Sequence, residues 1–511
     1  MTDGVIVVAR TVRWFVVNQH RTDGAAPDQG ALTAARKRAV RQLLRIAPIA
    51  DELGATFSAA GHDIALVGGS VRDALLDRLG HDLDFTTSAR PEQTEALLQG
   101  WADAIWSIGR AYGTIGARKG DFQIEITTYR ADRYAAESRK PEVEYGSAIE
   151  EDLLRRDFTV NAMAVRLPER TFLDPFDGMA DLARGLLRTP GTPEESFSDD
   201  PLRMLRAARF SATLGFEVDD VVRAAMTAMV ERIQIVSTER VRDELSRTVL
   251  ADQPRRGLEL LVGTALAERV LPELPALRLE IDEHHRHKDV YEHSLTVLDQ
   301  AIELEQRLER ETPDLVVRLA ALLHDIGKPR TRRLEANGGV SFHHHDVVGA
   351  KMTRKRLKAL KYPTATIESV AQLVQLHLRF HGYGGGQWTD SAVRRYVRDA
   401  GEELERLHVL TRADCTTRNR RKATALRRAY DDLEARIDRL AEQEEMAAVR
   451  PDLDGRAIMT ILGIEPGPLV GRAYKHLLDY RLDHGPVGPA AAEAELRRWW
   501  AEQPEQPGGS A

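Results

Sequence analysis

The sequence of 511 residues contains one cysteine, few aromatic residues and no long apolar run. The single Cys415 excludes an internal disulfide, and no charged and apolar leader with a small-residue cleavage site stands at the start. No apolar stretch approaches the roughly 18 residues that a membrane-spanning helix needs. We therefore expect a soluble cytoplasmic protein that has no membrane partner and no evident obligate protein partner.

An excess of positive charge is also absent, because the formal net charge is −7 at pH 7. This value argues against a protein that coats nucleic acid, since phosphate binding needs dense Lys and Arg. Locally, however, two stretches of helical composition are strongly basic. They contain Lys351, Arg354, Lys355, Arg356, Lys358 and Lys361, and then Arg418, Arg420, Arg421, Lys422, Arg427 and Arg428. An RNA-binding surface and a solvated helix face are equally good interpretations.

The chain is longer than one domain, and its pattern changes at about Pro190. Before that point, helices alternate with strand-like segments, whereas Leu, Ala, Arg and Glu recur at helical period after it. Strands are predicted at 64–67, 83–86 and 122–127, and helices at 32–53 and from Val71 onward. The fold class is therefore predicted to be α+β, with a small mixed sheet followed by an all-helical remainder.

Two glycines, Gly68 and Gly69, lie between the first predicted strand and the helix that follows it. In such a turn, backbone N–H groups approach phosphate oxygens closely, and Arg72 adds a charged fork beside them. A plain turn is the alternative interpretation of a lone Gly-Gly pair. The residues that follow favour phosphate binding.

Asp82 and Asp84 stand two residues apart on a predicted strand, so both carboxylates face the same side, while Leu83 faces the core. Such a pair suits two Mg²⁺ ions, which prefer hard oxygen ligands. Glu125, on the polar face of another predicted strand, is expected to add a third carboxylate. A solvated acidic strand end is the alternative.

The segment Gly68-Gly-Ser-Val-Arg-Asp73, followed by Asp-Leu-Asp, resembles the signature of the polymerase-β-like nucleotidyltransferases, which include CCA-adding enzymes and bacterial poly(A) polymerases. The segment 155–163 resembles the second motif of this family. The resemblance implies that the incoming nucleotide is held by Arg155, Arg156, Asp157 and Asn161, in addition to Gly68, Gly69 and Arg72. A helix start capped by Asp157 or Thr159 explains the segment equally well.

The segment 199–210 resembles the family's amino-acid template, an acidic residue and an arginine three positions apart on a helix, here Asp200 and Arg203. Positions i and i+3 share a helix face, so an acceptor and a donor fork lie side by side and mimic a base edge. Arg206 and Arg209 continue the stripe and are expected to bind the nucleotide as well. An ordinary ion pair is the alternative. The segment 239–245 resembles the next motif.

Histidines and aspartates in a second region have the order His293, His324-Asp325 and Asp414, which resembles the HD phosphohydrolase superfamily. The resemblance implies a site for a divalent transition metal of unknown identity, with ligands from several helices. His345 and His377 are candidates for a second ion. Retention of all four primary positions favours an active site, although such a helical body can also bind RNA without metal chemistry.

Composition changes and the two resemblances together predict five parts. They are an N-terminal extension, partly disordered (1–45), a nucleotidyltransferase head (46–190), a helical neck with the nucleotide-selecting helix (191–265), an HD-type body (266–430) and a helical tail with a disordered end (431–511). The segment 454–471 resembles the C-terminal part of longer bacterial family members. Contact with RNA is expected there from the resemblance.

The resemblance implies template-independent addition of CCA to the 3′ end of the tRNA acceptor arm from CTP and ATP, with release of pyrophosphate. A CC-only or A-only tRNA nucleotidyltransferase and a poly(A) polymerase share these motifs and remain alternatives. The loop from about Arg130 to Glu151 is expected to matter to that choice. Two other classes are an HD phosphohydrolase with a non-catalytic RNA-binding head and a non-enzymatic RNA-binding adaptor.

Overall fold

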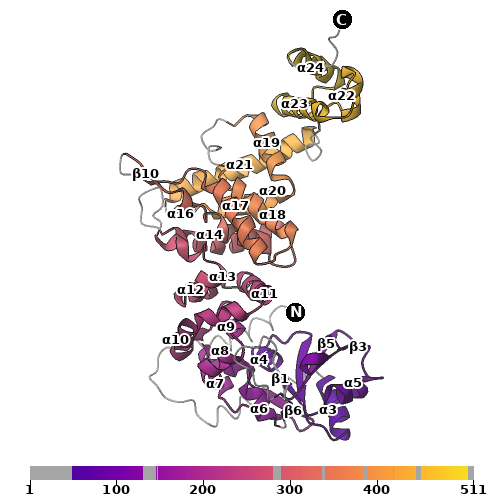
Figure 1. Ribbon diagram of the computed structural model, residues 1–511, viewed down its shortest axis with the longest axis vertical. Helices are drawn as coiled ribbons and strands as arrows, with labels where there is room; N and C mark the ends of the chain where they lie inside the picture. Colours follow the sequence, from indigo (N-terminus) through magenta and orange to yellow (C-terminus); the bar gives the residue numbers. More distant parts are fainter. Residues whose placement is uncertain are drawn as a thin grey trace. The chain divides into compact units, whose positions relative to one another are not determined.

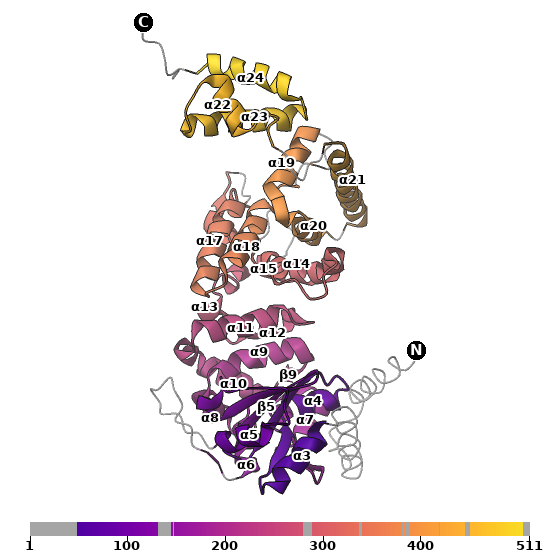
Figure 2. The same ribbon diagram turned by 90° about the vertical axis from the view of Figure 1, so that its right-hand side faces the viewer.

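The computed structural model describes residues 49–130, 145, 146, 148–279, 289–336, 340–380, 383, 388–417, 419–444 and 450–503. Contacts divide the chain at Pro272 into two compact units, called here the N-terminal unit and the C-terminal unit (Figures 1 and 2). Several predictions concern residues outside the described ranges. They are the extension 1–45, the helix before Ile49, Arg418, most of the loop 130–151 and the end after Gln503.

The N-terminal unit is built on a seven-stranded sheet in the order β3-β4-β5-β2-β1-β6-β7. Its strands are β1 (Ile64–Val67), β2 (Asp82–Thr87), β3 (Ala104–Trp106), β4 (Thr114–Lys119), β5 (Phe122–Thr128), β6 (Ala164–Leu167) and β7 (Thr171–Leu173). β2 and β5 are parallel, and every other neighbouring pair is antiparallel. The predicted α+β class and the three predicted strands are confirmed.

The two faces of this sheet differ because β2 and β5 alternate apolar and polar residues. Leu83, Phe85, Ile124 and Ile126 are buried on one face. Helix α5 (Pro91–Leu98) packs against β4 and β5, and α3 (Ile49–Ala59) packs against β1 and β6. The other face carries exposed polar side chains along β2 and β5. The alternation therefore leaves one polar face available for a site.

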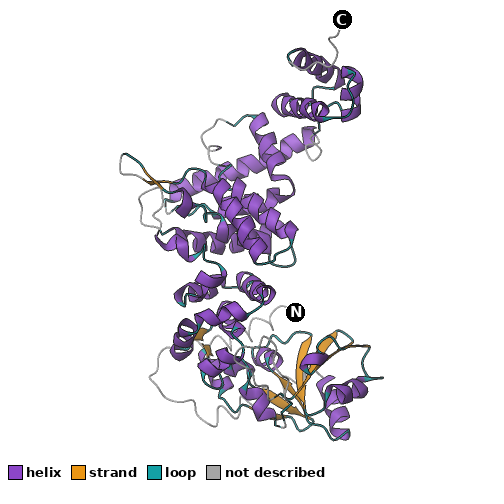
Figure 3. Cartoon of the chain, viewed as in Figure 1, coloured by secondary structure: helices purple, strands orange, loops and turns teal. Residues whose placement is uncertain are grey.

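Helices complete the N-terminal unit around this sheet, as Figure 3 shows. They are α4 (Gly69–Leu75), α6 (Ile149–Leu154), α7 (Gly178–Arg184), α8 (Pro193–Asp199), α9 (Leu202–Leu214), α10 (Asp220–Ala228), α11 (Thr238–Val249), α12 (Pro254–Gly263) and α13 (Leu266–Val270). Helix α9 packs against α11 and α12. A Cβ at Gly257 would lie 2.6 Å from the Ala208 carbonyl, so a glycine is needed where α12 crosses α9.

The C-terminal unit is helical in its described part, apart from the short pair β10 (Arg333–Leu334) and β11 (Val340–Ser341). Its main helices are α14 (Val290–Leu304), α15 (Leu315–Leu323), α16 (Lys328–Thr331), α17 (His345–Ala359), α18 (Thr364–Leu376), α19 (Asp390–Ala400), α20 (Leu404–Ala413), α21 (Arg420–Glu444), α22 (Gly455–Leu462), α23 (Pro468–His484) and α24 (Pro489–Ala501). The last three helices share a separate small core that includes Ile458, Leu477 and Leu496. Among the described helices, none has both the length and the apolar character of a membrane span.

Candidate functional site

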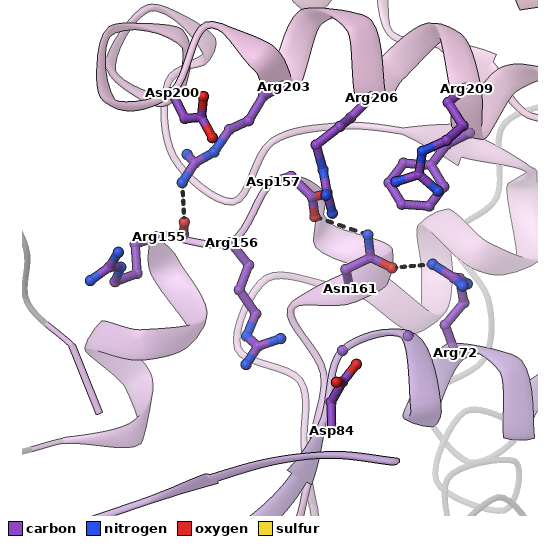
Figure 4. Close-up of a pocket in the computed structure, with 13 residues that line it drawn as sticks. Arg72, Asp84, Arg155, Arg156, Asp157, Asn161, Asp200, Arg203, Arg206 and Arg209 are labelled. Atoms are coloured by element: carbon purple, nitrogen blue, oxygen red, sulfur yellow. Dashed lines mark hydrogen bonds and ion pairs between the residues drawn. The ribbon is translucent and has the colours of Figure 1, made fainter. Parts of the chain in front are cut away.

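A pocket of about 380 Å³ opens beside the polar face of the sheet in the N-terminal unit (Figure 4). It is lined by Gly68, Gly69, Arg72, Asp84, Arg155, Arg156, Asp157, Asn161, Asp200, Arg203, Arg206, Arg209 and Phe210. The pocket thus brings together every residue predicted to bind the nucleotide, together with one of the predicted catalytic carboxylates. These residues come from separate segments between 68 and 210, so their convergence is a property of the fold.

The predicted catalytic carboxylates lie on adjacent strands. Asp82 and Asp84 are exposed on one face of β2, and Leu83 between them is buried. Glu125 on β5 lies directly opposite Asp84 in the parallel register. Ser70 fixes β2 to α4, because its hydroxyl donates to the Asp82 carbonyl (3.3 Å) and accepts from the Asp84 amide (2.9 Å).

Desolvation and neighbouring charge both act on the pKa values of Asp84 and Glu125. Desolvation raises the pKa of Asp84, with Asp82 adding to the shift and Arg156 opposing it. Desolvation, followed by the charges of Asp84 and Asp82, raises the pKa of Glu125. Oxygen ligands that repel one another are stabilised by a hard divalent cation, so the three carboxylates fit Mg²⁺.

The glycine turn above β1 is required by its backbone and by a neighbour. Gly68 has φ 68°, a left-handed conformation that favours glycine. A Cβ there would lie 2.6 Å from Nη1 of Arg156. Arg156 also pairs with Asp152 (3.2 Å). The missing side chain at Gly68 therefore leaves room for a guanidinium beside the glycine turn.

A chain of polar contacts connects α4 to α9 across the pocket. Arg72 donates to Asp73 and, through Nη1, to the Asn161 side-chain oxygen (2.5 Å). The amide nitrogen of Asn161 donates to Asp157 Oδ1 (2.9 Å), and Arg206 donates to Asp157 Oδ2 (2.7 Å). Burial would raise the pKa of Asp157, but Arg206 and Asn161 outweigh it and hold that pKa well below its usual value. Asp157 is therefore ionised in the folded protein.

The prediction of a capped α-helix start in the segment 155–163 is wrong. Helix α6 ends at Leu154, and only one 3-10 turn, η3 (Thr159–Asn161), follows before β6. The carboxylate of Asp157 is occupied by Arg206, Asn161 and the Phe158 amide, and the hydroxyl of Thr159 donates to Asp181. Neither side chain is left to cap a longer helix.

The expected pair Asp200 and Arg203 is present in the pocket, but the two residues do not share a helix. Asp200 lies in the extended link between α8 and α9, and α9 begins at Leu202. Its Oδ1 accepts from the Leu202 amide (3.1 Å). Arg203 is buried and donates to the Ser196 hydroxyl (2.9 Å) and to the Arg155 carbonyl. Protein contacts thus fix the Arg203 fork beside the Asp200 carboxylate.

Two residues of α11 hold the pocket wall, a role that the sequence prediction missed. Arg240 donates to Asp200 Oδ2 (2.7 Å), and Glu244, which is buried, accepts from Arg209 (2.7 Å). Their i, i+4 spacing puts both on one helix face and was the available signal. Partners 35 and 40 residues away could not be read from that spacing.

Phe210 packs beneath the arginines of the pocket. The centroid of its ring lies 4.0 Å from the guanidinium carbon of Arg209, 5.2 Å from that of Arg72 and 5.5 Å from that of Arg206. Burial lowers the pKa of Arg209, although Glu244 opposes that effect. Arg206 and Arg209 therefore line the pocket with guanidinium groups that already contact protein partners.

A second cluster of polar side chains lies in the C-terminal unit and contains the four predicted ligands. Nε2 of His293 lies 3.2 Å from Nε2 of His324 and 3.0 Å from Asp414 Oδ1, and His324 lies 3.1 Å from Asp325. His293 is on α14, whereas His324 and Asp414 follow the last residues of α15 and α20. The His-Asp pair lies in the turn that follows α15.

His345 and His377 extend this cluster, as the sequence suggested. Their Nε2 atoms lie 3.3 Å and 3.9 Å from Asp325 Oδ1, yet neither makes a hydrogen bond within the described residues. In both rings, and in His324, Nδ1 contacts the carbonyl three residues earlier at 2.6–2.8 Å. In His345 and His377, that contact favours the tautomer with a bare Nε2, which is the form that binds metal.

Charge in the cluster agrees with a cation site. Burial lowers the pKa of His377 to about 4, so its ring is neutral. At His324, burial opposes protonation, but Asp325 and Asp414 raise the pKa to about 9. The buried Asp325 and the half-buried Asp414 therefore stabilise positive charge at this point, and two unsatisfied ring nitrogens lie next to Asp325. The donor set fits a divalent transition metal.

Comparisons with known proteins agree with this geometry. Family models match as "Poly A polymerase head domain" over 64–188, "Probable RNA and SrmB- binding site of polymerase A" over 215–277 and "HD domain" over 290–419. The A-adding tRNA nucleotidyltransferase of Deinococcus radiodurans is 34% identical over 447 residues, which cover 86% of this chain and 96% of that protein. The chain belongs to the tRNA nucleotidyltransferase family. It is an enzyme that transfers nucleotides.

Other members of the family match over less of their length or at lower identity. The CCA-adding enzyme of Streptococcus gordonii is 38% identical over 226 residues, 44% of this chain and 55% of that protein. The structure of the Bacillus stearothermophilus CCA-adding enzyme with CTP has a TM-score of 0.58 at 23% identity, covering 89% of this nucleotidyltransferase and 98% of that chain. At this identity, the likeness demonstrates the fold alone. Nucleotidyltransferase and HD families generally use divalent metals.

Proposed function

We propose that this nucleotidyltransferase adds C, C and A to the 3′ end of the tRNA acceptor arm from CTP and ATP, without a nucleic-acid template. One observation carries the proposal: a single pocket has the Asp84 carboxylate on one side, arginines in the middle, and the Asp200–Arg203 pair on the other side (Figure 4). This order matches the metals, triphosphate and base of a nucleoside triphosphate. The family membership supports the same reading.

Asp82, Asp84 and Glu125 are the residues that would hold two Mg²⁺ ions. When bound, the ions supply activation of the RNA 3′-hydroxyl and neutralisation of the leaving pyrophosphate. The protein's own residues position the nucleotide. The Gly68–Gly69 turn and the guanidinium groups of Arg72 and Arg156 bind the triphosphate, because these two cations act on Asp84 and a Cβ at Gly69 would lie 4.0 Å from its carboxylate. Arg155 lines the same pocket.

Arg72, Asn161 and Asp157 form the connected chain described above and contact the ribose and the phosphates from the α4 side. Arg206 and Arg209 support this side of the pocket. Arg206 pairs with Asp157, and Arg209 packs on the ring of Phe210. Because the donors are already oriented by Asp73 and Asp157, little reorganisation is needed when a nucleotide enters. Positioning rather than covalent chemistry is therefore the protein's main contribution to in-line attack on the α-phosphorus.

Base choice is assigned to Asp200 and Arg203. A carboxylate acceptor beside a guanidinium donor complements an amino donor beside an unprotonated ring nitrogen, which cytosine and adenine both present. Uracil and guanine present the opposite order, a carbonyl acceptor beside a ring N–H. Arg203 is fixed by Ser196 and Arg155, and Asp200 by Arg240. Replacement of either residue should relax discrimination against GTP and UTP. Unchanged nucleotide preference in Asp200→Ala and in Arg203→Ala would refute this assignment.

The experiment uses tRNA transcripts that end before C, after C and after CC. Each is incubated with Mg²⁺ and single labelled nucleotides, and then with mixtures, and the product length is read on a sequencing gel. Full CCA activity gives three additions, two from CTP and one from ATP, followed by arrest. Additions of unlimited length from ATP would instead identify a poly(A) polymerase, and extension by CTP alone a CC-only enzyme.

A second candidate is an A-only enzyme. It is favoured by the Deinococcus radiodurans relative, which aligns with most of this chain and is named as A-adding. The same gel separates the two candidates: an A-only enzyme extends the transcript ending in CC with ATP and leaves the other two transcripts unextended with CTP. The loop from Arg130 to Glu151, proposed to matter for this choice, lies mostly outside the described residues.

For the HD centre, we propose that His293, His324, Asp325 and Asp414 hold a divalent transition metal, with His345 and His377 available to a second ion. When bound, such an ion supplies Lewis-acid activation of water for phosphate-ester hydrolysis. The phosphohydrolase is proposed as an additional activity. A phosphohydrolase with a non-catalytic head, or an RNA-binding adaptor, would not need the intact pocket around Asp84.

The five predicted parts remain our proposed domain division, namely 1–45, 46–190, 191–265, 266–430 and 431–511. We also propose a cytoplasmic location, since tRNA, CTP and ATP are all available there. Whether the basic residues of α17 and α21 bind RNA stays a prediction. Arg354 and Arg356 already pair with Glu368 and Glu273, so they are the weakest candidates for phosphate contact on α17.

A further inference from the structure

The polar face of the sheet continues past the carboxylates to an aromatic side chain. In the strand register, Asp84 is opposite Glu125, Glu125 is opposite Gly116, and Gly116 is opposite Trp106. Residues opposite one another on neighbouring strands point to the same face. One row across β2, β5, β4 and β3 therefore contains two carboxylates, a glycine and an indole.

The indole of Trp106 occupies the space above Gly116. A Cβ at Gly116 would lie 2.0 Å from Nε1 and 2.2 Å from Cε2 of Trp106, so the ring crosses directly over the glycine. Gly116 is buried beneath it, while Trp106 remains partly exposed. The ring thus extends from the edge strand β3 over β4 and toward Glu125.

The next row on this face adds a cation. Arg118 on β4 is exposed and lies opposite Gln123, which lies opposite Asp82. The other face of these strands is apolar and buried, with Leu83, Ala117 and Ile124. Trp106 and Arg118 are therefore not part of the main core. They border the catalytic carboxylates on a face that is open to solvent.

The chemistry determines what approaches this face. In-line transfer requires the attacking 3′-hydroxyl and the leaving pyrophosphate to lie on opposite sides of the phosphorus. The proposed nucleotide pocket extends from Asp84 toward Arg72, Arg156 and Arg203 (Figure 4). The RNA end must then arrive from the side of β5 and β4. Two strand spacings, about 10 Å, separate the backbones of β2 and β4, within reach of the last nucleotides of the RNA.

We propose that Trp106, supported by Gly116, is a stacking platform for a base near the 3′ end of the RNA acceptor, with Arg118 beside it for the phosphate. The proposal rests on the proposed nucleotidyl transfer and names a binding subsite for its acceptor. Stacking tolerates any base, because every base presents a π-face. A growing end that changes after each addition needs such tolerance, and a hydrogen-bonding subsite would not provide it.

The kinetic test compares Trp106→Leu, Trp106→Phe and wild type. Trp106→Leu should raise KM for the RNA by about 10-fold, within the range of about 5- to 150-fold that loss of one stacked base produces. KM for CTP should change less than about 2-fold, and Trp106→Phe should recover most of the loss. Trp101→Leu is the matched control, since Trp101 contacts Glu52 and Lys119. Equal loss in Trp106→Leu and Trp106→Phe, or a parallel rise in both KM values, would overturn the proposal.

A binding test does not depend on turnover. A short RNA hairpin that ends in CC and contains 2-aminopurine near its 3′ end is titrated with each variant, and thermal unfolding confirms that each variant is folded. Wild type should quench the analogue by stacking, whereas Trp106→Leu should not. Gly116→Ala should act like Trp106→Leu, because the added methyl displaces the ring without removing it.

Quenching that is equal in wild type and Trp106→Leu would reject the subsite even if tRNA extension is normal. Absence of extension with any transcript would instead reject the proposed function, whatever the fluorescence shows. The two failures are therefore distinguishable.

Discussion

The two charged centres of this protein are built in opposite ways. In the nucleotide pocket, Asp84 is open to solvent, and arginines such as Arg206 already contact protein carboxylates. In the HD cluster, Asp325, His345 and His377 are buried, and two ring nitrogens find no hydrogen bond among the described residues. Open, oriented charges suit substrates that enter and leave, whereas buried unsatisfied ligands suit a resident ion. From this difference, we expect the pocket to exchange substrates and the HD cluster to retain an ion.

The largest effect is expected from a substitution of Asp84, the exposed carboxylate of the pocket. Asp84→Asn should slow nucleotide incorporation by about 10³-fold or more, because several kcal/mol of transition-state stabilisation depends on the metal site. Affinity for CTP should change little, since the arginines remain. Primer extension at saturating CTP and equilibrium binding measure the two quantities. Glu95→Gln on α5 is the control, and an Asp84→Asn rate within tenfold of wild type would contradict the assignment.

The proposed resident ion of the HD cluster is tested by removing one of its ligands. His324→Ala should remove about one bound transition metal ion per chain after dialysis, as measured by inductively coupled plasma mass spectrometry, because a primary ligand is lost. His343→Ala changes an exposed histidine near the same cluster and should keep the metal. Equal metal content in wild type and His324→Ala, or no metal in either after loading, would contradict the metal centre.

His408, a half-buried histidine outside both centres, is expected to make stability depend on pH. Desolvation lowers the pKa of His408 from 6.5 to about 4, although Glu434 opposes the shift and Arg412 and Arg307 add to it. Its contribution to stability is therefore present above pH 6.5 and is lost as the pH falls toward 4, by about 3 kcal/mol.

Urea unfolding between pH 7 and 4 measures this loss. His408→Phe keeps the aromatic ring beside Tyr396 and removes the titrating group. The variant should lose less stability than wild type over this interval. Identical pH profiles of the unfolding free energy would show that His408 does not titrate as described.

The smallest effect is expected at the exposed ion pair between Arg240 and Asp200. Arg240→Ala should reduce the preference for CTP and ATP over UTP and GTP by about fivefold, the equivalent of roughly 1 kcal/mol for an exposed pair. The maximal rate should change less, because Arg240 contacts Asp200 and not the predicted catalytic carboxylate Asp84. Misincorporation assays with each nucleotide measure the ratio. A fall in rate with intact selectivity would show that Arg240 supports the fold rather than base choice.

Much of the catalytic region followed from local patterns. Period-two alternation predicted that Asp82 and Asp84 share a face, and the apolar run 64–67 predicted β1. The edge strand β3 and its neighbour β4 were missed, because β3 has three residues and neither strand has a strong alternating pattern. That omission also hid Trp106 and Gly116, whose relation depends on strand register rather than on sequence spacing.

The rest of the site could not be predicted, because its contacts join residues that are far apart in the sequence. The alternative interpretation of 155–163 as a capped helix start fails because Asp157 is occupied by Arg206, which lies 49 positions away. Asp200 was expected on a helix but ends in a link, where Arg240 holds its carboxylate from another helix. Ion pairs of this kind depend on how helices pack, so residue types alone could name the participants but not their partners.

The central claim is tested most directly by sequencing the 3′ ends of tRNA after incubation with the enzyme, Mg²⁺ and all four nucleoside triphosphates together. Transcripts that begin without CCA, with C or with CC should all end in CCA, with neither G nor U incorporated. Ends of mixed composition, A tails of variable length, or extension restricted to the transcript ending in CC would contradict it.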